Sequence, residues 1–143
     1  MRGLLDVNVL IALLDAAHVH HHLASRWLAD HIGHGWASCP LTQLGCIRVM
    51  AQSAYPNMQP AAQVAERLQA AAATPHHEFW SADTDLLAAD TVRWSELLTS
   101  RHATDAYLLA LAAARGGRFV TFDQHVPLRA VPSADAGHLT VIG

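Results

Sequence analysis

The apolar residues of the chain fall into two patterns, short continuous runs and longer stretches with helical spacing. Short runs bounded by turn residues predict strands, and here they are "GLLDV", "GWASCP", "EFWSA", "RFVTF" and "LTVI". Between these runs, apolar residues recur every three or four positions, which predicts helices. Strands separated by helices form parallel sheets with helices on both faces. The pattern therefore predicts an α/β fold, with a central, mostly parallel sheet of four to five strands.

Helices in the first half of the chain have clear start signals. A short helix is expected directly after Asp6, and a second one within residues 18–33. Thr42 is expected to cap a third helix, because its hydroxyl can accept a hydrogen bond from the free amides of a first turn. Pro60 is expected to open an alanine-rich fourth helix. Each of these helices follows a predicted strand or turn.

The second half of the chain is less evenly marked. The segments "DTDLLAAD" and "VRWSELLTS" are predicted as short helices from their apolar spacing. The stretch "SRHATDAYLLALAAARGG" predicts the clearest helix of the chain, ended by Gly116 and Gly117. The final run "LTVI" is expected to be an outer strand.

Length and composition predict one domain over residues 1–143. Hydrophobic residues make up 52% of the chain and charged residues 15%, which suits a folded protein with an apolar interface. No apolar run reaches the roughly 18 residues of a membrane span. Aspartates interrupt the apolar N-terminal stretch, which does not resemble a signal peptide. A cytoplasmic protein without a membrane partner is expected.

The charged residues and cysteines exclude several kinds of chemistry. All nine basic residues are arginines, so Schiff-base catalysis and a P-loop lysine are excluded. The formal net charge of −3 gives no overall basic field for nucleic acid. Cys39 and Cys46 are expected to be buried thiols, because the chain has no CxxC pair and no secretory signal.

Three aspartates stand where strands give way to helices or loops. Asp6 follows the first apolar run, Asp123 follows "RFVTF", and Asp105 lies in the first turn of the clearest helix. In an open parallel sheet, ligand sites form at the carboxyl ends of the strands. Carboxylates gathered there repel one another unless a cation lies between them, and a hard divalent ion prefers carboxylate oxygens. The sequence therefore predicts a site for Mg²⁺ or Mn²⁺.

Each aspartate also has a simpler explanation. Asp6 can cap the following helix, Asp105 can interact with a helix dipole, and Asp123 can close a turn. The position of all three at one edge of the predicted sheet favours the metal site over three separate structural roles.

The stretches "LLDVNVLIALLD", "WASCPLTQLGCIRVM" and "TDAYLLALAAARGGRFVTFD" occur in an order and at a spacing that mark a known family. With them, nearly the whole chain resembles the PIN-domain ribonucleases, in particular the VapC-type toxins of bacterial toxin–antitoxin pairs. In that family four residues bind Mg²⁺ or Mn²⁺ for RNA cleavage. The resemblance places these catalytic residues at Asp6, Gln43, Asp105 and Asp123, with the three aspartates as metal ligands.

The resemblance implies a Mg²⁺- or Mn²⁺-dependent endoribonuclease toxin that hydrolyses RNA, such as tRNA or rRNA, with metal-activated water. It also implies a cognate VapB-type antitoxin and a homodimer. Asn8 and Thr121 are expected to hydrogen-bond near the aspartates. Gln43 departs from the family pattern, which more often has Glu there. An amide brings no negative charge, so the resemblance does not fix whether one or two ions bind.

Other functions stay open from the sequence. A PIN-like module that only binds a partner would fit the loss of charge at Gln43. A haloacid-dehalogenase-like phosphatase is a weaker alternative, because Asn8 replaces the second aspartate of its motif and its lysine is missing. A zinc site in "HVHHH" is not favoured, because His18 and His22 form the one helical pair there.

Overall fold

A computed structural model describes all 143 residues of the chain. Its centre is a five-stranded sheet in the order β3-β2-β1-β4-β5, in which every neighbouring pair is parallel. The strands are β1 (Gly3–Leu5), β2 (Trp36–Ser38), β3 (His77–Phe79), β4 (Arg118–Thr121) and β5 (Leu139–Val141). The predicted parallel α/β sheet is confirmed, and "LTVI" forms the predicted outer strand.

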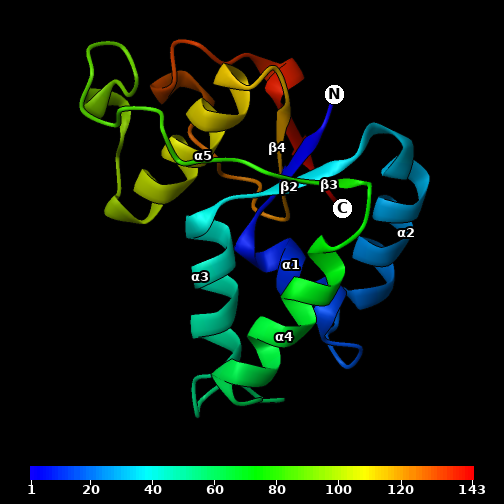
Figure 1. Cartoon of the computed structure of the whole chain (residues 1–143). Helices are drawn as coiled ribbons and strands as arrows, with labels where there is room; N and C mark the ends of the chain where they lie inside the picture. The colour runs from blue at the N-terminus through cyan, green and yellow to red at the C-terminus, as the bar shows by residue number, and fades with distance from the viewer.

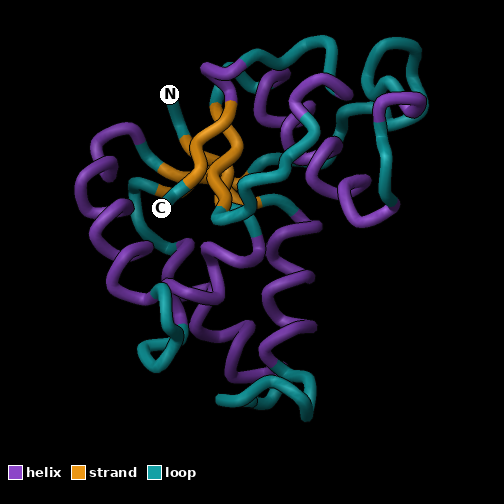
Figure 2. Tube along the Cα trace, turned by 180° about the vertical axis from the view of Figure 1, so that it is seen from behind, coloured by secondary structure: helices purple, strands orange, loops and turns teal.

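Helices cover both faces of this sheet, as predicted (Figure 1). They are α1 (Val7–Leu14), α2 (His21–His31), α3 (Pro40–Met50), α4 (Ala61–Ala72) and α5 (Ala103–Ala114). Helix α5 packs on one face, whereas α1, α3 and α4 lie below the sheet in Figure 1, and Figure 2 shows the same layers from behind. The carboxyl ends of the strands meet between these layers.

Two hydrophobic cores lie on opposite faces of the sheet because successive strand residues point in opposite directions. In β1, Leu4 belongs to the core under α5 and Leu5 to the core around α1 and α3. In β4, Phe119 and Val120 divide in the same way. Consecutive residues of these central strands are therefore apolar, which is why the sequence shows short continuous apolar runs there.

The start of α3 differs from the prediction. The helix begins at Pro40, with Cys39 as its N-cap, so Thr42 is the third helical residue and not the cap. The Thr42 hydroxyl accepts a hydrogen bond from the Cys39 backbone N–H at 3.0 Å. Proline suits the first helical position because it has no N–H to satisfy there. Pro40 therefore opens the helix as well as ending the predicted strand.

The prediction of two short helices between residues 83 and 100 is wrong. This segment contains turns and a 3₁₀ turn at Trp94–Glu96 but no α-helix before α5. Leu86 and Leu97 pack against the core under α5, but Leu87 is 81% exposed and Leu98 is 93% exposed, so the leucines do not form one continuous buried face. Helical spacing of apolar residues predicts a helix only where that face is buried against the rest of the protein.

The segment around Gly116 and the two thiols agree with the sequence analysis. Helix α5 ends before Gly116, whose φ of 67° lies in the left-handed region that glycine adopts readily. Cys39 and Cys46 are free and buried. None of the helices is both long and apolar enough to cross a membrane.

Candidate functional site

Asp6 joins the central strand β1 to helix α1 and is only 8% exposed. One carboxylate oxygen, Oδ1, accepts a hydrogen bond from the Val7 N–H at 2.7 Å, which makes Asp6 the N-cap of α1. The other oxygen, Oδ2, accepts a hydrogen bond from the Thr121 hydroxyl at 2.6 Å. Asp6 thus caps helix α1 and also lies at the carboxyl edge of the sheet, so the two explanations of this residue do not exclude each other.

Thr121 and Asn8 connect Asp6 to the end of β4. The Asn8 side-chain amide donates to the Thr121 hydroxyl oxygen at 3.2 Å, and the Asp123 backbone N–H donates to the same oxygen at 3.1 Å. Thr121 is fully buried, so this network is closed to solvent on one side. The hydrogen bonds expected for Asn8 and Thr121 are therefore present, and they fix the position of the Asp6 carboxylate.

Asp105 approaches the same edge from the first turn of α5. Burial raises its pKa, and so do the negative charges of Asp6 and Asp123 and a hydrogen bond with Asp123, bringing it to about 7. Burial also raises the pKa of Asp6, and the charge of Asp123 adds to this, although the hydrogen bonds from Thr121 and Val7 partly offset both effects. The three predicted aspartates therefore act on one another electrostatically.

No basic side chain neutralises this acidic cluster of Asp6, Asp105 and Asp123. The three ion pairs of the chain lie elsewhere and join Arg2 to Glu78, Arg115 to Asp83 and His138 to Asp135. Repelling carboxylates without a cation are unfavourable, and their oxygens are the ligands that Mg²⁺ and Mn²⁺ prefer. The donor atoms and the unbalanced charge fit a hard divalent ion.

The side chains of the acidic cluster are not arranged as a preformed coordination shell. No three His, Cys, Asp or Glu side chains surround a single point as ligands of an ion would. Asp6 is held by its cap and by Thr121, while Asp105 is paired with Asp123. The structure thus shows an acidic cluster with suitable ligand types.

Comparison with known sequences shows the family to which the chain belongs. The sequence model of the PIN domain matches residues 3–132. The chain belongs to the PIN-domain family and, within it, to the VapC type. It is 49% identical over 142 residues to Ribonuclease VapC44 of Mycobacterium tuberculosis (strain ATCC 25618 / H37Rv), covering 99% of this chain and 100% of that protein.

Two further relatives from the same strain agree with this assignment. Ribonuclease VapC39 is 38% identical over 144 residues, covering 99% of this chain and 100% of that protein. Ribonuclease VapC29 is 40% identical over 123 residues, covering 86% of each chain. The resemblance drawn from the sequence is confirmed at the level of the PIN-domain family.

Gln43, the fourth predicted site residue, lies in the first turn of α3 on this PIN-domain scaffold. Its side-chain nitrogen Nε2 donates a hydrogen bond to the Ser38 hydroxyl oxygen at 3.0 Å. It is neutral and does not contribute to the pKa shifts of Asp6 or Asp105. Its role in metal binding therefore stays a prediction.

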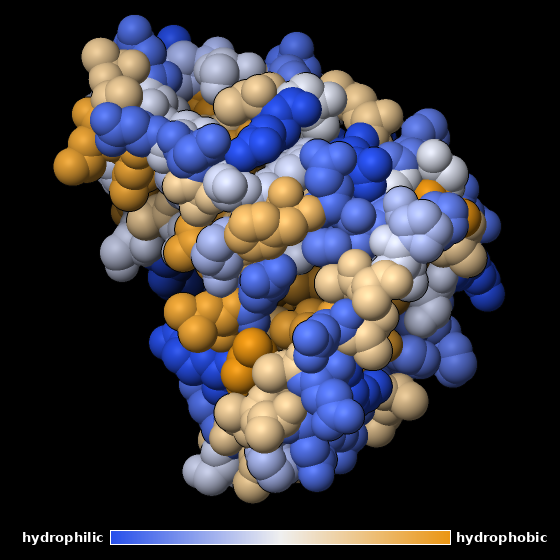
Figure 3. All heavy atoms as spheres, viewed as in Figure 1, coloured by the Kyte–Doolittle hydropathy of each residue, from blue (hydrophilic) through white to orange (hydrophobic).

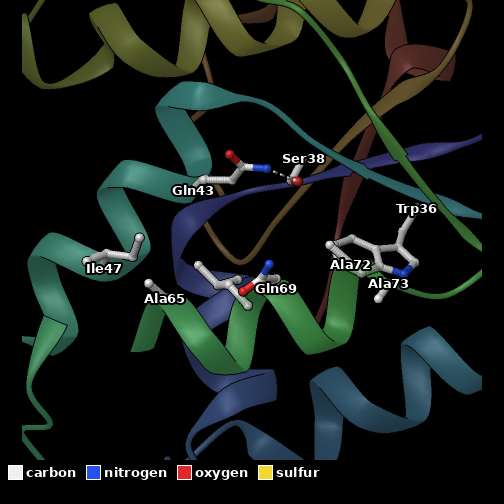
Figure 4. Close-up of a pocket in the computed structure, with 9 residues that line it drawn as sticks. Trp36, Ser38, Gln43, Ile47, Ala65, Gln69, Ala72 and Ala73 are labelled. Carbon is white, nitrogen blue, oxygen red and sulfur yellow. Dashed lines mark hydrogen bonds between the residues drawn. The ribbon is translucent and has the colours of Figure 1, made fainter. Parts of the chain in front are cut away.

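A groove of about 460 Å³ opens beside Gln43, between α3 and α4 (Figure 4). Its lining is mostly apolar and consists of Trp36, Ser38, Gln43, Ile47, Ala65, Leu68, Gln69, Ala72 and Ala73. Figure 3 shows hydrophobic side chains gathered on this face of the molecule. Leu41 and Leu44 of α3 are 42% and 64% exposed. This face combines a hollow with exposed apolar residues.

Two polar residues next to Gln43, Ser38 and His77, were not predicted from the sequence. The Ser38 hydroxyl lies 2.8 Å from Nε2 of His77, which belongs to the neighbouring strand β3. Only the register of the two strands brings these residues together, and short apolar runs do not specify a register. A polar residue at the end of a buried strand was the one available signal.

Proposed function

We propose that this chain is a Mg²⁺- or Mn²⁺-dependent endoribonuclease toxin of a type II toxin–antitoxin system. Its VapC relatives are named as ribonucleases, and the likeness to two of them extends over nearly the full length of both chains. One observation of the structure supports the metal dependence most strongly. Three carboxylates converge without a basic partner, and the pKa of Asp105 is raised to about 7.

Asp6, Asp105 and Asp123 are the residues that would hold the ion, directly or through water. When bound, a divalent ion lowers the pKa of a water molecule and offsets the charge that develops on the phosphate. Thr121 fixes one oxygen of Asp6, and the backbone of Val7 fixes the other, so this carboxylate cannot rotate freely. Asn8 keeps the Thr121 hydroxyl in place from a third direction.

The proposed hydrolysis uses water as the nucleophile and needs no nucleophilic side chain. The Asp6 and Thr121 side chains are buried, whereas Asp105 and Asp123 are only partly buried. Unpaired RNA is the substrate class proposed here, because its backbone and unstacked bases can adapt to these partly exposed carboxylates.

The proposed partners are a VapB-type antitoxin and a second copy of the chain. Exposed apolar residues are a feature of protein interfaces, and Leu41 and Leu44 are two such residues beside the groove. An antitoxin segment with apolar side chains suits this surface.

The test is cleavage of total RNA by the purified chain with Mg²⁺ or Mn²⁺, with and without EDTA. Asp6→Asn and Asp105→Asn are each expected to lower the cleavage rate at least about 100-fold, because each removes a metal ligand. Asp30→Asn is the matched control, since Asp30 is exposed on α2 and lies outside the cluster. Cleavage that persists in EDTA, or in both site variants, would contradict the proposal. A folded chain that cuts no RNA would favour a binding module.

A further inference from the structure

A chain of three polar side chains lies at the edge of the groove between α3 and α4. The Gln43 amide nitrogen donates to the Ser38 hydroxyl oxygen at 3.0 Å, and that oxygen lies 2.8 Å from Nε2 of His77. Figure 4 shows the Gln43 amide nitrogen turned toward Ser38. Ser38 is only 2% exposed, so water cannot easily replace either partner.

The chemistry of these groups fixes the direction of both hydrogen bonds. The Gln43 nitrogen can only donate, so the Ser38 oxygen accepts from it. The single proton of the Ser38 hydroxyl is then free for His77, provided that Nε2 of His77 carries no proton. In that case the chain runs in one direction, from Gln43 through Ser38 to His77.

Two features of His77 leave Nε2 as an acceptor. The ring also hydrogen-bonds the backbone of Ala72, in a contact that raises its pKa, and a backbone carbonyl places the ring proton on the other nitrogen. Burial lowers the pKa of His77, as does the nearby Arg2 charge, and the net shift is downward from the ordinary 6.5. The ring is therefore neutral at neutral pH. The ring lies against Trp36 in a tilted arrangement, at 4.4 Å between ring centroids.

The direction of this chain determines which end of the Gln43 amide remains free. Because the nitrogen is bound to Ser38, the amide oxygen points away from Ser38 and out of the groove (Figure 4). An amide oxygen can bind a cation or orient its water, whereas an amide NH₂ group cannot. For a glutamine, unlike a glutamate, the orientation of the group therefore decides whether it can assist a cation.

We propose that Ser38 and His77 are positioning residues: they hold the Gln43 amide nitrogen and so leave the amide oxygen free to assist a cation at the acidic cluster. A glutamate at position 43 would attract a cation by its charge. The neutral Gln43 amide can assist a cation only if its oxygen is held in the right orientation, which Ser38 and His77 provide. This inference rests on the proposed metal-dependent function, and it assigns a role to two residues outside the four predicted site residues.

The experiment measures Mn²⁺ affinity of the full chain by calorimetry, without RNA. Ser38→Ala removes the acceptor for the Gln43 nitrogen and is expected to weaken Mn²⁺ binding on the order of 10-fold. His77→Leu removes the acceptor of the Ser38 proton, so the Ser38 hydroxyl can donate to the Gln43 oxygen instead, and the amide is expected to turn around. Its expected loss is at least as large as that of Ser38→Ala.

The decisive control repeats both substitutions in a Gln43→Glu background. A carboxylate has two equivalent oxygens and no N–H, so Ser38→Ala and His77→Leu are expected to change Mn²⁺ affinity less than about 2-fold there. An equal loss in both backgrounds would overturn the inference, because it would indicate a general disturbance of the fold. Unchanged affinity in the Gln43 chain would overturn it as well.

Two further measurements keep these outcomes separate. Circular dichroism identifies a variant that fails to fold, and if Ser38→Ala fails, His77→Leu decides the inference alone. Asp105→Asn tests the proposed function in the same titration. If Asp105→Asn binds Mn²⁺ as tightly as the wild type, the metal site itself is wrong. If only Asp105→Asn loses affinity, the metal site stands and the positioning role of Ser38 and His77 is refuted.

Discussion

Helix α1 carries a buried aspartate at each end, and the two carboxyl groups have pKa values shifted in opposite directions. Burial raises the pKa of Asp6 at the N-terminal end. Asp15 at the C-terminal end is 3% exposed, and burial acts on it in the same sense. Hydrogen bonds from Tyr55, Asn57 and Ala17 nevertheless lower the pKa of Asp15 overall. Burial alone therefore does not tell a structural acid from a site acid.

The surroundings of the two ends explain the difference. Asp15 faces only donors: the Tyr55 hydroxyl, the Asn57 side-chain amide at 2.9 Å and the Ala17 backbone N–H at 3.0 Å. Asp6 has two donors but also shares its edge with Asp105 and Asp123. A carboxylate surrounded by donors stabilises the fold, whereas carboxylates beside one another cost stability until a cation arrives. This contrast between the Asp15 end and the Asp6 end can be tested.

The largest effect on stability is expected at the Asp15 end. Asp15→Ala leaves three donors without their acceptor and should lower the free energy of unfolding by about 3 kcal/mol. Cleavage by the fraction that remains folded should not change. Urea unfolding monitored by tryptophan fluorescence measures the effect, with Asp30→Ala as an exposed control. A loss no larger than that of the control would mean that the Asp15 network is not structural.

The matched pair Asp15→Asn and Asp105→Asn should shift stability in opposite directions. Asp15→Asn weakens charge-assisted hydrogen bonds and should destabilise the chain by about 1 kcal/mol. Asp105→Asn removes repulsion and should stabilise the metal-free chain by up to about 1 kcal/mol, a modest figure because Asp105 is only half-buried. Thermal unfolding in EDTA at pH 8 compares the two. Two shifts of the same sign would remove the contrast.

A smaller effect is expected in how the stability changes of the two Asn variants depend on pH. The folded chain binds a proton at Asp105 below about pH 7, whereas the unfolded chain binds it near the ordinary value of 3.8. Charged Asp105 therefore lowers stability fully above pH 7, and this loss fades as pH falls toward 3.8. Asp15, with its lowered pKa, stabilises the fold above 3.8, and this stabilisation is lost only as pH falls through that lowered pKa.

The measurement is the difference in unfolding free energy between each Asn variant and the wild type, in EDTA from pH 8 to pH 5. Differences are needed because histidines titrate in the same range. The advantage of Asp105→Asn should shrink as pH falls, while the deficit of Asp15→Asn should stay constant. An advantage of Asp105→Asn that is independent of pH would contradict the raised pKa.

The sequence predicted the central strands and the main helices better than the segments that connect them. The strands ending at Leu5 and Thr121 and the helix after His102 have patterns that fit both their local structure and their burial. The segment around Leu87 and Leu98 has helical spacing as well, but nothing covers those leucines. Local spacing does not state whether a face will be buried, so the two helices predicted there do not form.

The same limit applies to the acids. Asp6, Asp105 and Asp123 were predicted as a group because each stands at the end of an element, and the rules of parallel sheets bring such ends together. Asp15 drew no attention because its partners, Tyr55 and Asn57, lie 40 and 42 residues further along the chain. Contacts of that kind depend on how helices and loops pack, which no local pattern records.

The most direct test of the acidic cluster as a cation site is a calorimetric titration with Mn²⁺ at pH 7 in two buffers of different ionisation enthalpy. The wild type and Asp15→Asn are expected to bind Mn²⁺ and to release a fraction of a proton, because Asp105 is partly protonated at that pH. Asp105→Asn is expected to bind at least about 10-fold more weakly. A wild type that does not bind Mn²⁺, or an Asp105→Asn variant that binds it equally well, would contradict this account.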